Sequence, residues 1–206
     1  MSIRSFSSDE GKARLERAIA AAESKTSAEV VIAVRRAASP HHRTTIVFAS
    51  AAMLVGLAAW WFSPVAYDVR LLPLEMIFVF ALGGFVVRSI DPLRRVLTPR
   101  ATLRAELERE AREAFASLGV ANTTGRTGIL VVAGLFEHDA AVLADEGLGY
   151  ESLRAEAVPI ERRLAAAVRD GDVESFSVAI ESLGALLGTT NPRSEDDENE
   201  LCDSVR

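Results

Sequence analysis

Two long apolar stretches in the first half of the chain, Thr44–Ala66 and Leu71–Val87, constrain its fold more than any other feature. The first has no charged residue, and at a rise of about 1.5 Å per residue it is long enough to cross a hydrocarbon core of about 30 Å. The second is shorter, at about 17 residues, and carries Glu75 near its start. We expect a transmembrane helical hairpin over residues 44–90, with spans at about 44–66 and 71–89. A pair of helices buried in the core of a soluble domain is the alternative that the same apolar runs leave open.

Arginines flank the predicted hairpin unevenly. Three precede the first span and three follow the second, whereas the connecting loop has one: Arg35, Arg36 and Arg43; Arg88, Arg94 and Arg95; and Arg70. Cationic side chains near span ends are retained on the cytoplasmic side, so we expect a multi-pass protein of the inner or plasma membrane with both termini in the cytoplasm. Trp60 and Trp61 close the first span, where an aromatic belt would lie.

Charge divides the chain into a basic and an acidic half. Residues 1–99 hold 12 Lys and Arg against 8 Asp and Glu, whereas residues 100–206 hold 11 against 21. The acidic half would repel phosphate backbones, so no nucleic-acid partner is expected, and the basic clusters need only the lipid bilayer as theirs. The single cysteine, Cys202, excludes an internal disulfide and argues against a cysteine metal site.

Periodicity predicts an α/β arrangement around the hairpin. We expect helices over about 9–24, 99–118, 158–169 and 173–187, the first with a Ser7–Glu10 capping box, and strands over 29–34, 128–133 and 140–144. The last two strands are close enough in sequence for an antiparallel hairpin, whereas the first and second need a crossover and should be parallel, which gives a small mixed sheet. The continuous apolar run of the first strand suggests a central position in that sheet. The acidic segment 191–206 should be disordered.

Several segments resemble the TPM-domain family, in its bacterial membrane-anchored branch. They are residues 114–120, 125–132, 135–138 and 142–148, with further support from 26–31 and 180–187. The resemblance implies a three-layer α/β/α, Rossmann-like domain formed by residues 1–43 and 91–190, with the transmembrane hairpin as an insertion and 191–206 as a tail. It also implies that some relatives bind divalent cations or have been assigned phosphatase activity, whereas others are linked to photosystem repair or receptor assembly.

Candidate residues for chemistry are few. Asp145 and Glu146 follow the third strand beside two glycines, where a loop could gather oxygen ligands around Ca²⁺ or Mg²⁺. Two carboxylates alone are a weak signal, and a surface turn in which the acids cap the following backbone is the simpler explanation. The acid–imidazole cluster 137–139 lies at a hairpin tip, where such residues are usually solvated. Glu29 would need a partner if buried, and Arg126 is a candidate. Standard enzyme signatures such as a phosphate-binding P-loop, GxSxG or HExxH are missing from the sequence.

Three classes of function follow from these observations. The preferred one is a noncatalytic module that binds or helps assemble another membrane protein while the hairpin confines it to the bilayer. The second is a divalent-cation-dependent phosphatase that uses Asp145 and Glu146. The third is a transport component, which would require a homo-oligomer, and Gly83 and Gly84 would permit close helix packing. The sequence does not decide whether the protein is an enzyme.

Overall fold

The computed structural model describes residues 3–38, 42–63, 68–193 and 205. They form a mixed α/β fold whose sheet has three strands in the order β1-β2-β3. Strands β1 and β2 pair in parallel from Glu29↔Gly128 to Arg35↔Gly134, and β3 pairs with β2 antiparallel. The predicted mixed sheet is therefore confirmed, with both pairings as expected. The strands are β1 Glu29–Arg35, β2 Gly128–Gly134 and β3 Asp139–Ala144.

Six of the seven α-helices of the described residues correspond to predicted helices or spans, with differences at a few boundaries. Helix α4 was not expected, and α6 begins at Arg154 although Val158 was the predicted start, with Pro159 accommodated inside it. The N-cap of α1 is Ser8, whose side chain accepts a hydrogen bond from Gly11 N–H, so the predicted cap at Ser7 was one residue early. The helices are α1 Asp9–Glu23, α2 His42–Phe62, α3 Leu72–Ser89, α4 Asp91–Leu97, α5 Arg100–Ser117, α6 Arg154–Asp170 and α7 Val173–Leu187.

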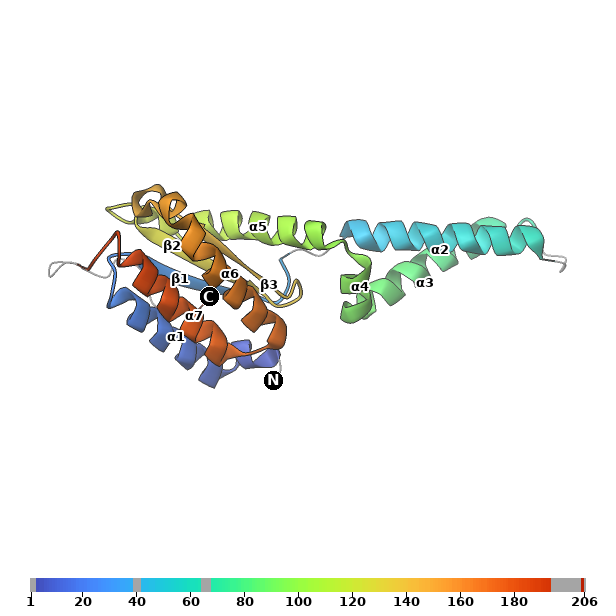
Figure 1. Cartoon of the computed structure of the whole chain (residues 1–206). Helices are drawn as coiled ribbons and strands as arrows, with labels where there is room; N and C mark the ends of the chain where they lie inside the picture. Colours follow the sequence, from blue (N-terminus) through green and yellow to red (C-terminus); the bar gives the residue numbers. More distant parts are fainter. Residues whose placement is uncertain (1–2, 39–41, 64–67, 194–204, 206) are drawn as a thin grey trace. The chain divides into compact units, whose positions relative to one another are not determined.

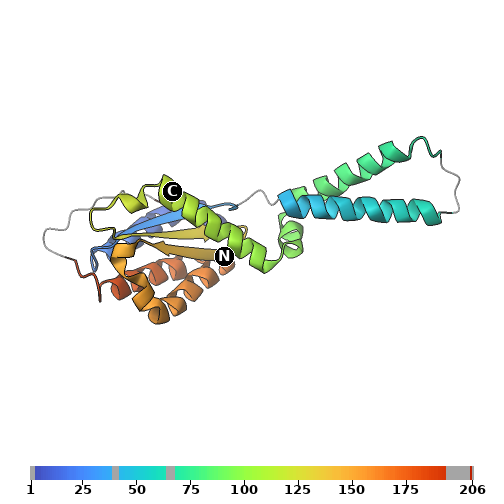
Figure 2. The same cartoon turned by 90° about the horizontal axis from the view of Figure 1, so that it is seen from above.

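The chain divides into two compact units, residues 1–39 with 104–206 and residues 40–103. In the first unit, different helices cover the two faces of the sheet (Figures 1 and 2). Side chains such as Ile32 and Val131 join α1, α6 and α7 in one hydrophobic cluster, whereas Leu130 and Val132 join α5 in another. Both faces of β1 and β2 are thus covered, which explains their almost continuous apolar sequences.

Strand β1 lies at an edge of the sheet, so the expectation of a central position was wrong. The central strand is β2, all seven residues of which are buried. The apolar run of β1 reflects the helices above and below it and carries no information about how many strands lie beside it.

The second unit is built around α2 and α3, which pack against each other. Close approach is possible because small residues face one another: a Cβ added to Gly83 would lie 3.0 Å from Ala52 Cβ, and one added to Gly84 would lie 3.6 Å from Ala49 Cβ. The hydroxyls of Thr44 and Thr98 lie 3.0 Å apart, both buried, and this hydrogen bond ties the start of α2 to the end of α4.

Two predicted boundaries fall partly on residues outside the described ranges. Helix α2 ends at Phe62, and residues 64–66 of the predicted first span are among those not described. Most of the predicted disordered tail is likewise outside the described residues. The first residues of that segment, however, are held in place. Pro192 forms an isolated antiparallel β-bridge with Thr26, and Asn191 O accepts hydrogen bonds from Ser27 N–H at 3.0 Å and from Thr26 Oγ1 at 2.7 Å.

Candidate functional site

The loop after β3 holds the two predicted metal ligands. Asp145 is the N-cap of a short 3-10 helix, Glu146–Leu148, and its Oδ1 accepts a hydrogen bond from Glu146 N–H at 2.7 Å. The Asp145 side chain is only 4% exposed, whereas that of Glu146 is 82% exposed. The two adjacent carboxylates therefore lie in very different surroundings.

Arg126 connects both carboxylates. Its guanidinium lies 3.0 Å from Asp145 Oδ1 and 3.0 Å from Glu146 Oε2. The hydrogen bond to Asp145, followed by the negative charges of Asp145 and Glu146, raises the pKa of Arg126 above its ordinary value. Arg126 has a positive φ of 52°, which an arginine adopts only at some cost in free energy, so the surrounding turn holds it in this conformation.

Gly147 allows the two loops to meet. Its N–H donates to Arg126 O at 3.0 Å, and a Cβ at this position would collide with the backbone carbonyl oxygens of Gly125 and Arg126. The glycine is required by close backbone contact, which the sequence reading had assigned to a simple turn. The loop 125–127 and the loop 145–147 thus form one packed unit at the end of the sheet where β3 stops.

As a cation site, this loop pair is incomplete. Asp145 Oδ2 is buried and has no hydrogen-bond partner in the described part of the chain, so it is one oxygen with free lone pairs. Ca²⁺ takes about 6–8 oxygen ligands, and within the described ranges no group of three or more His, Cys, Asp or Glu side chains is placed to hold a metal ion. Arg126 already forms ion pairs with both acids, so their arrangement fits a structural ion-pair cluster better than a cation site.

Glu29 is buried at the start of β1, and the arginine suggested as its partner has other contacts. The ion pairs of Arg126 go to Asp145 and Glu146, on the opposite side of the central strand from β1. The backbone N–H of Glu29 donates to Thr127 O at 3.1 Å, next to Arg126.

The cluster 137–139 is not a solvated hairpin tip. Glu137 is only 6% exposed, and its Oε1 accepts a hydrogen bond from Ala38 N–H at 2.9 Å. Asp139 pairs with Arg104 at 3.2 Å, and His138 has a positive φ of 53°. Glu137 therefore positions the backbone just after β1. The sequence did not predict this role, because the tip of a hairpin is normally exposed.

The most exposed apolar surface belongs to α2 and α3. Thr44–Phe62 and Leu72–Ser89, of 19 and 18 residues, are long and apolar enough to cross a membrane, and only 6% of each apolar window is buried. This exposure does not fit the alternative of two helices buried in a soluble core.

Comparison with known proteins adds information about the fold only. No family model and no curated protein matches the chain. The NMR structure of the BA42 protein from the psychrophilic bacterium Bizionia argentinensis is similar to it, with a TM-score of 0.57 at 14% sequence identity, over 96% of this chain and 92% of that one. At this identity the likeness concerns the mixed α/β fold, and the chain is assigned to no family on this basis.

Proposed function

We propose that the chain is a membrane-anchored TPM-domain protein that acts as an interaction or assembly and repair accessory module at the cytoplasmic face of the inner or plasma membrane. One observation carries the proposal. Of the 18 large hydrophobic side chains that are exposed in the described part of the chain, 17 lie between Ile46 and Val96, and the remaining one is Val178. A contiguous apolar surface of this kind needs a cover, and lipid covers it without any further protein.

The proposed domain is a three-layer, Rossmann-like α/β/α sandwich interrupted by the hairpin. Two separate hydrophobic clusters on the two sides of the sheet support the three layers. The order along the chain, in which α2 and α3 come between β1 and β2, supports the insertion. The similarity to BA42 supports the fold but says nothing about activity.

A noncatalytic role agrees with the chemistry of the loops described above. Arg126 forms ion pairs with both Asp145 and Glu146, and Glu137 accepts a hydrogen bond from the backbone N–H of Ala38. An anchored domain of this kind would act by raising the effective concentration of its partner-binding surface at the membrane.

Carbonate extraction of membranes tests the anchor. We expect the full chain to stay with the membrane pellet at alkaline pH and to be released only by detergent. Release into the soluble fraction would contradict membrane anchoring. Crosslinking in intact membranes, followed by identification of the neighbours, tests the accessory role, for which the expected result is one reproducible neighbour that is itself a membrane protein.

A divalent-cation-dependent phosphatase is the second candidate function, favoured by the buried free oxygen of Asp145. If this alternative holds, the full chain in detergent hydrolyses p-nitrophenyl phosphate in the presence of Mg²⁺ or Ca²⁺. Asp145→Asn should then abolish hydrolysis, while Asp139→Asn, at the opposite end of β3, should not. No hydrolysis above a blank with either cation would remove this candidate.

A further inference from the structure

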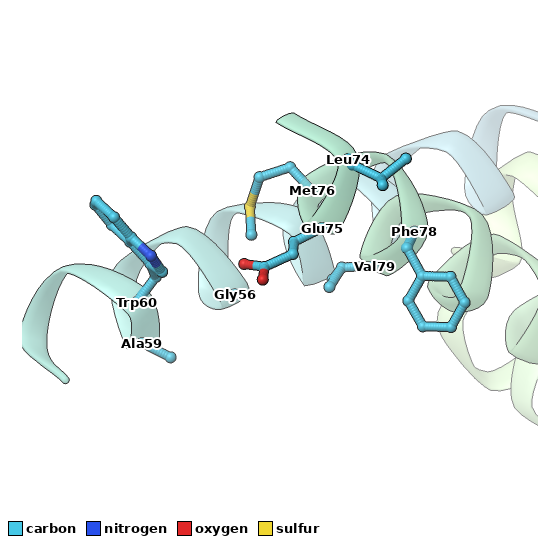
Figure 3. A pocket seen from close by; sticks show the side chains of 8 residues that line it. All are labelled: Gly56, Ala59, Trp60, Leu74, Glu75, Met76, Phe78 and Val79. Atoms are coloured by element: carbon cyan, nitrogen blue, oxygen red, sulfur yellow. The ribbon is translucent and has the colours of Figure 1, made fainter. Parts of the chain in front are cut away.

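A pocket of about 690 Å³ lies between α2 and α3 within the second unit. Figure 2 shows the two helices separating toward the ends at Phe62 and Leu72. The lining is apolar apart from the carboxylate of Glu75 and the indole nitrogen of Trp60 (Figure 3). The residues that line it are Gly56, Ala59 and Trp60 of α2 and Leu74, Glu75, Met76, Phe78 and Val79 of α3.

Glu75 has no partner for its charge among the described residues. It is half-buried, its backbone N–H bonds to Leu71 O at 3.0 Å, and its side chain makes no hydrogen bond or ion pair within the described ranges. Figure 3 shows its carboxylate pointing from α3 toward α2, where Gly56 leaves space. A carboxylate in an apolar pocket is costly unless a cation or a hydrogen-bond donor approaches it.

Trp60 supplies a hydrogen-bond donor at the same end of the hairpin. It is the third residue from the end of α2, and its indole Nε1 is buried with no hydrogen-bond partner in the described part of the chain. Glu75 is the fourth residue of α3, or about 4.5 Å from its start, which is the depth of lipid headgroups if both helices span a bilayer. The pocket thus offers one acceptor at that depth, above an apolar wall, and a rotation of the Trp60 indole would add one donor.

We propose that this pocket binds a phospholipid whose headgroup ends in a primary ammonium group, of the phosphatidylethanolamine type. The inference rests on the proposed membrane anchoring of the hairpin. The ammonium, with three N–H donors, pairs with Glu75, and a phosphate oxygen of the same headgroup accepts from Trp60 once the indole turns toward it. One acyl chain lies against the apolar lining, and the volume is within the range of about 300–1,000 Å³ that is usual for small-molecule sites.

Charge complementarity selects this lipid among common membrane lipids. A quaternary ammonium headgroup carries the same charge but has no N–H to donate, and an anionic headgroup is repelled by Glu75. The preference should therefore follow the order primary ammonium, quaternary ammonium, anionic.

Native mass spectrometry of the full chain, released from vesicles that contain equal amounts of phosphatidylethanolamine, phosphatidylcholine and phosphatidylglycerol, tests the proposal. We expect wild type to retain phosphatidylethanolamine about tenfold over phosphatidylcholine, the effect of one charge-assisted hydrogen bond, and to retain phosphatidylglycerol least. Glu75→Gln should lose this preference. Gly56→Leu should also reduce retention, because the added side chain enters the pocket, where a Cβ alone would lie 3.4 Å from Val79. Asp68→Asn, at an acid exposed in the loop, is the control and should behave as wild type.

The outcomes separate the pocket from the anchor. Flotation of the chain with vesicles reports on the anchor, and the retained lipids report on the pocket. If the chain floats with vesicles but retains the three lipids in equal amounts, the lipid site is wrong and the anchor stands. The same conclusion follows if Glu75→Gln keeps the preference for phosphatidylethanolamine. If the chain does not float with vesicles of any lipid composition, the proposed membrane anchor is itself wrong. If the wild type is a dimer that Glu75→Gln dissociates, without any change in bound lipid, a second copy of the chain occupies the pocket and the lipid proposal is wrong.

Discussion

Asp145 and Glu146 share one arginine at the same distance but differ in burial, so they measure what burial adds to an ion pair. Asp145→Ala should lower the free energy of unfolding by about 1–2 kcal/mol. The substitution removes the acceptor of the hydrogen bond from Glu146 N–H, so the loop 145–147 loses the contact that holds its conformation. Urea unfolding of the full chain in detergent, followed by circular dichroism, measures the change.

Glu146→Ala is the matched control for that experiment. Its carboxylate is 82% exposed, and exposed ion pairs contribute about 0–1 kcal/mol, so the unfolding midpoint should move little. Equal effects of the two substitutions would mean that the loop is held by Arg126 alone, without a special role for the buried acid.

Asp172 provides a pH-dependent contribution at the start of α7. Hydrogen bonds from the Ser175 side chain, and from the backbone N–H groups of Ser175 and Glu174, lower the pKa of Asp172 below its ordinary 3.8. A carboxyl with a lowered pKa in the folded state stabilises the protein above its unfolded-state pKa, and this contribution disappears as the pH falls through the folded-state value.

The substitution Asp172→Asn should therefore change the pH dependence and not the stability at neutral pH. Asparagine is an equally good N-cap, so at pH 7 the free energy of unfolding should change by less than about 0.5 kcal/mol. As the pH falls below about 4, the variant should lose less stability than wild type. Parallel pH profiles of the urea midpoint for the two proteins would contradict this interpretation.

Single residues show where sequence patterns stop being informative. The cap at Asp172 could be predicted, because capping is local and depends only on neighbouring backbone groups. The burial of Glu137 could not, because its partner Ala38 is 99 residues away in sequence. The partners of Arg126 were likewise uncertain, since its left-handed backbone conformation sets the direction of the side chain.

Helices α1 and α7 pack so closely at Gly184 that adding one methyl group there should force them apart. A Cβ at Gly184 would lie 2.5 Å from both Cα and Cβ of Ala22. Gly184→Ala should destabilise the protein by about 1–3 kcal/mol, even though alanine favours a helix over glycine by about 1 kcal/mol. Thermal unfolding by circular dichroism gives the comparison.

Ser182→Ala is the control on the same helix. Among the described residues the Ser182 hydroxyl donates its hydrogen bond to Val178 O, one turn earlier, so alanine should be neutral or slightly stabilising there. A stabilising effect of Gly184→Ala as well would show that α1 and α7 can separate without cost, contrary to the close contact described above.

Strand β1 illustrates what can be predicted at the scale of an element. Its type, its length to within a residue and its parallel pairing followed from β-branched composition and from the long crossover. Its place at the edge did not follow, because burial on both faces gives the same apolar run to an edge strand and to a central one. Helix α4 was missed because its seven residues are too few for a periodic pattern.

The distribution of charge over the whole molecule gives the last prediction. Arginines lie on both flanks of the apolar hairpin, while the loop has one, Arg70, whose backbone N–H bonds to Asp68 Oδ1. Moving several arginines across a membrane is costly, so the loop should cross and both flanks should remain in the cytoplasm. Val69 is 64% exposed and is a suitable position for a label.

Cysteine labelling in bacterial spheroplasts measures this orientation, and the native Cys202 makes a paired design possible. If the loop lies outside as proposed, a membrane-impermeant maleimide should label Val69→Cys in a Cys202→Ser background before lysis. If the acidic half lies inside, the same reagent should reach Cys202 of the wild-type chain only after lysis. Labelling of Cys202 before lysis, with Val69→Cys protected, would reverse the orientation, whereas labelling of both before lysis would show that the two helices do not span the bilayer as a hairpin.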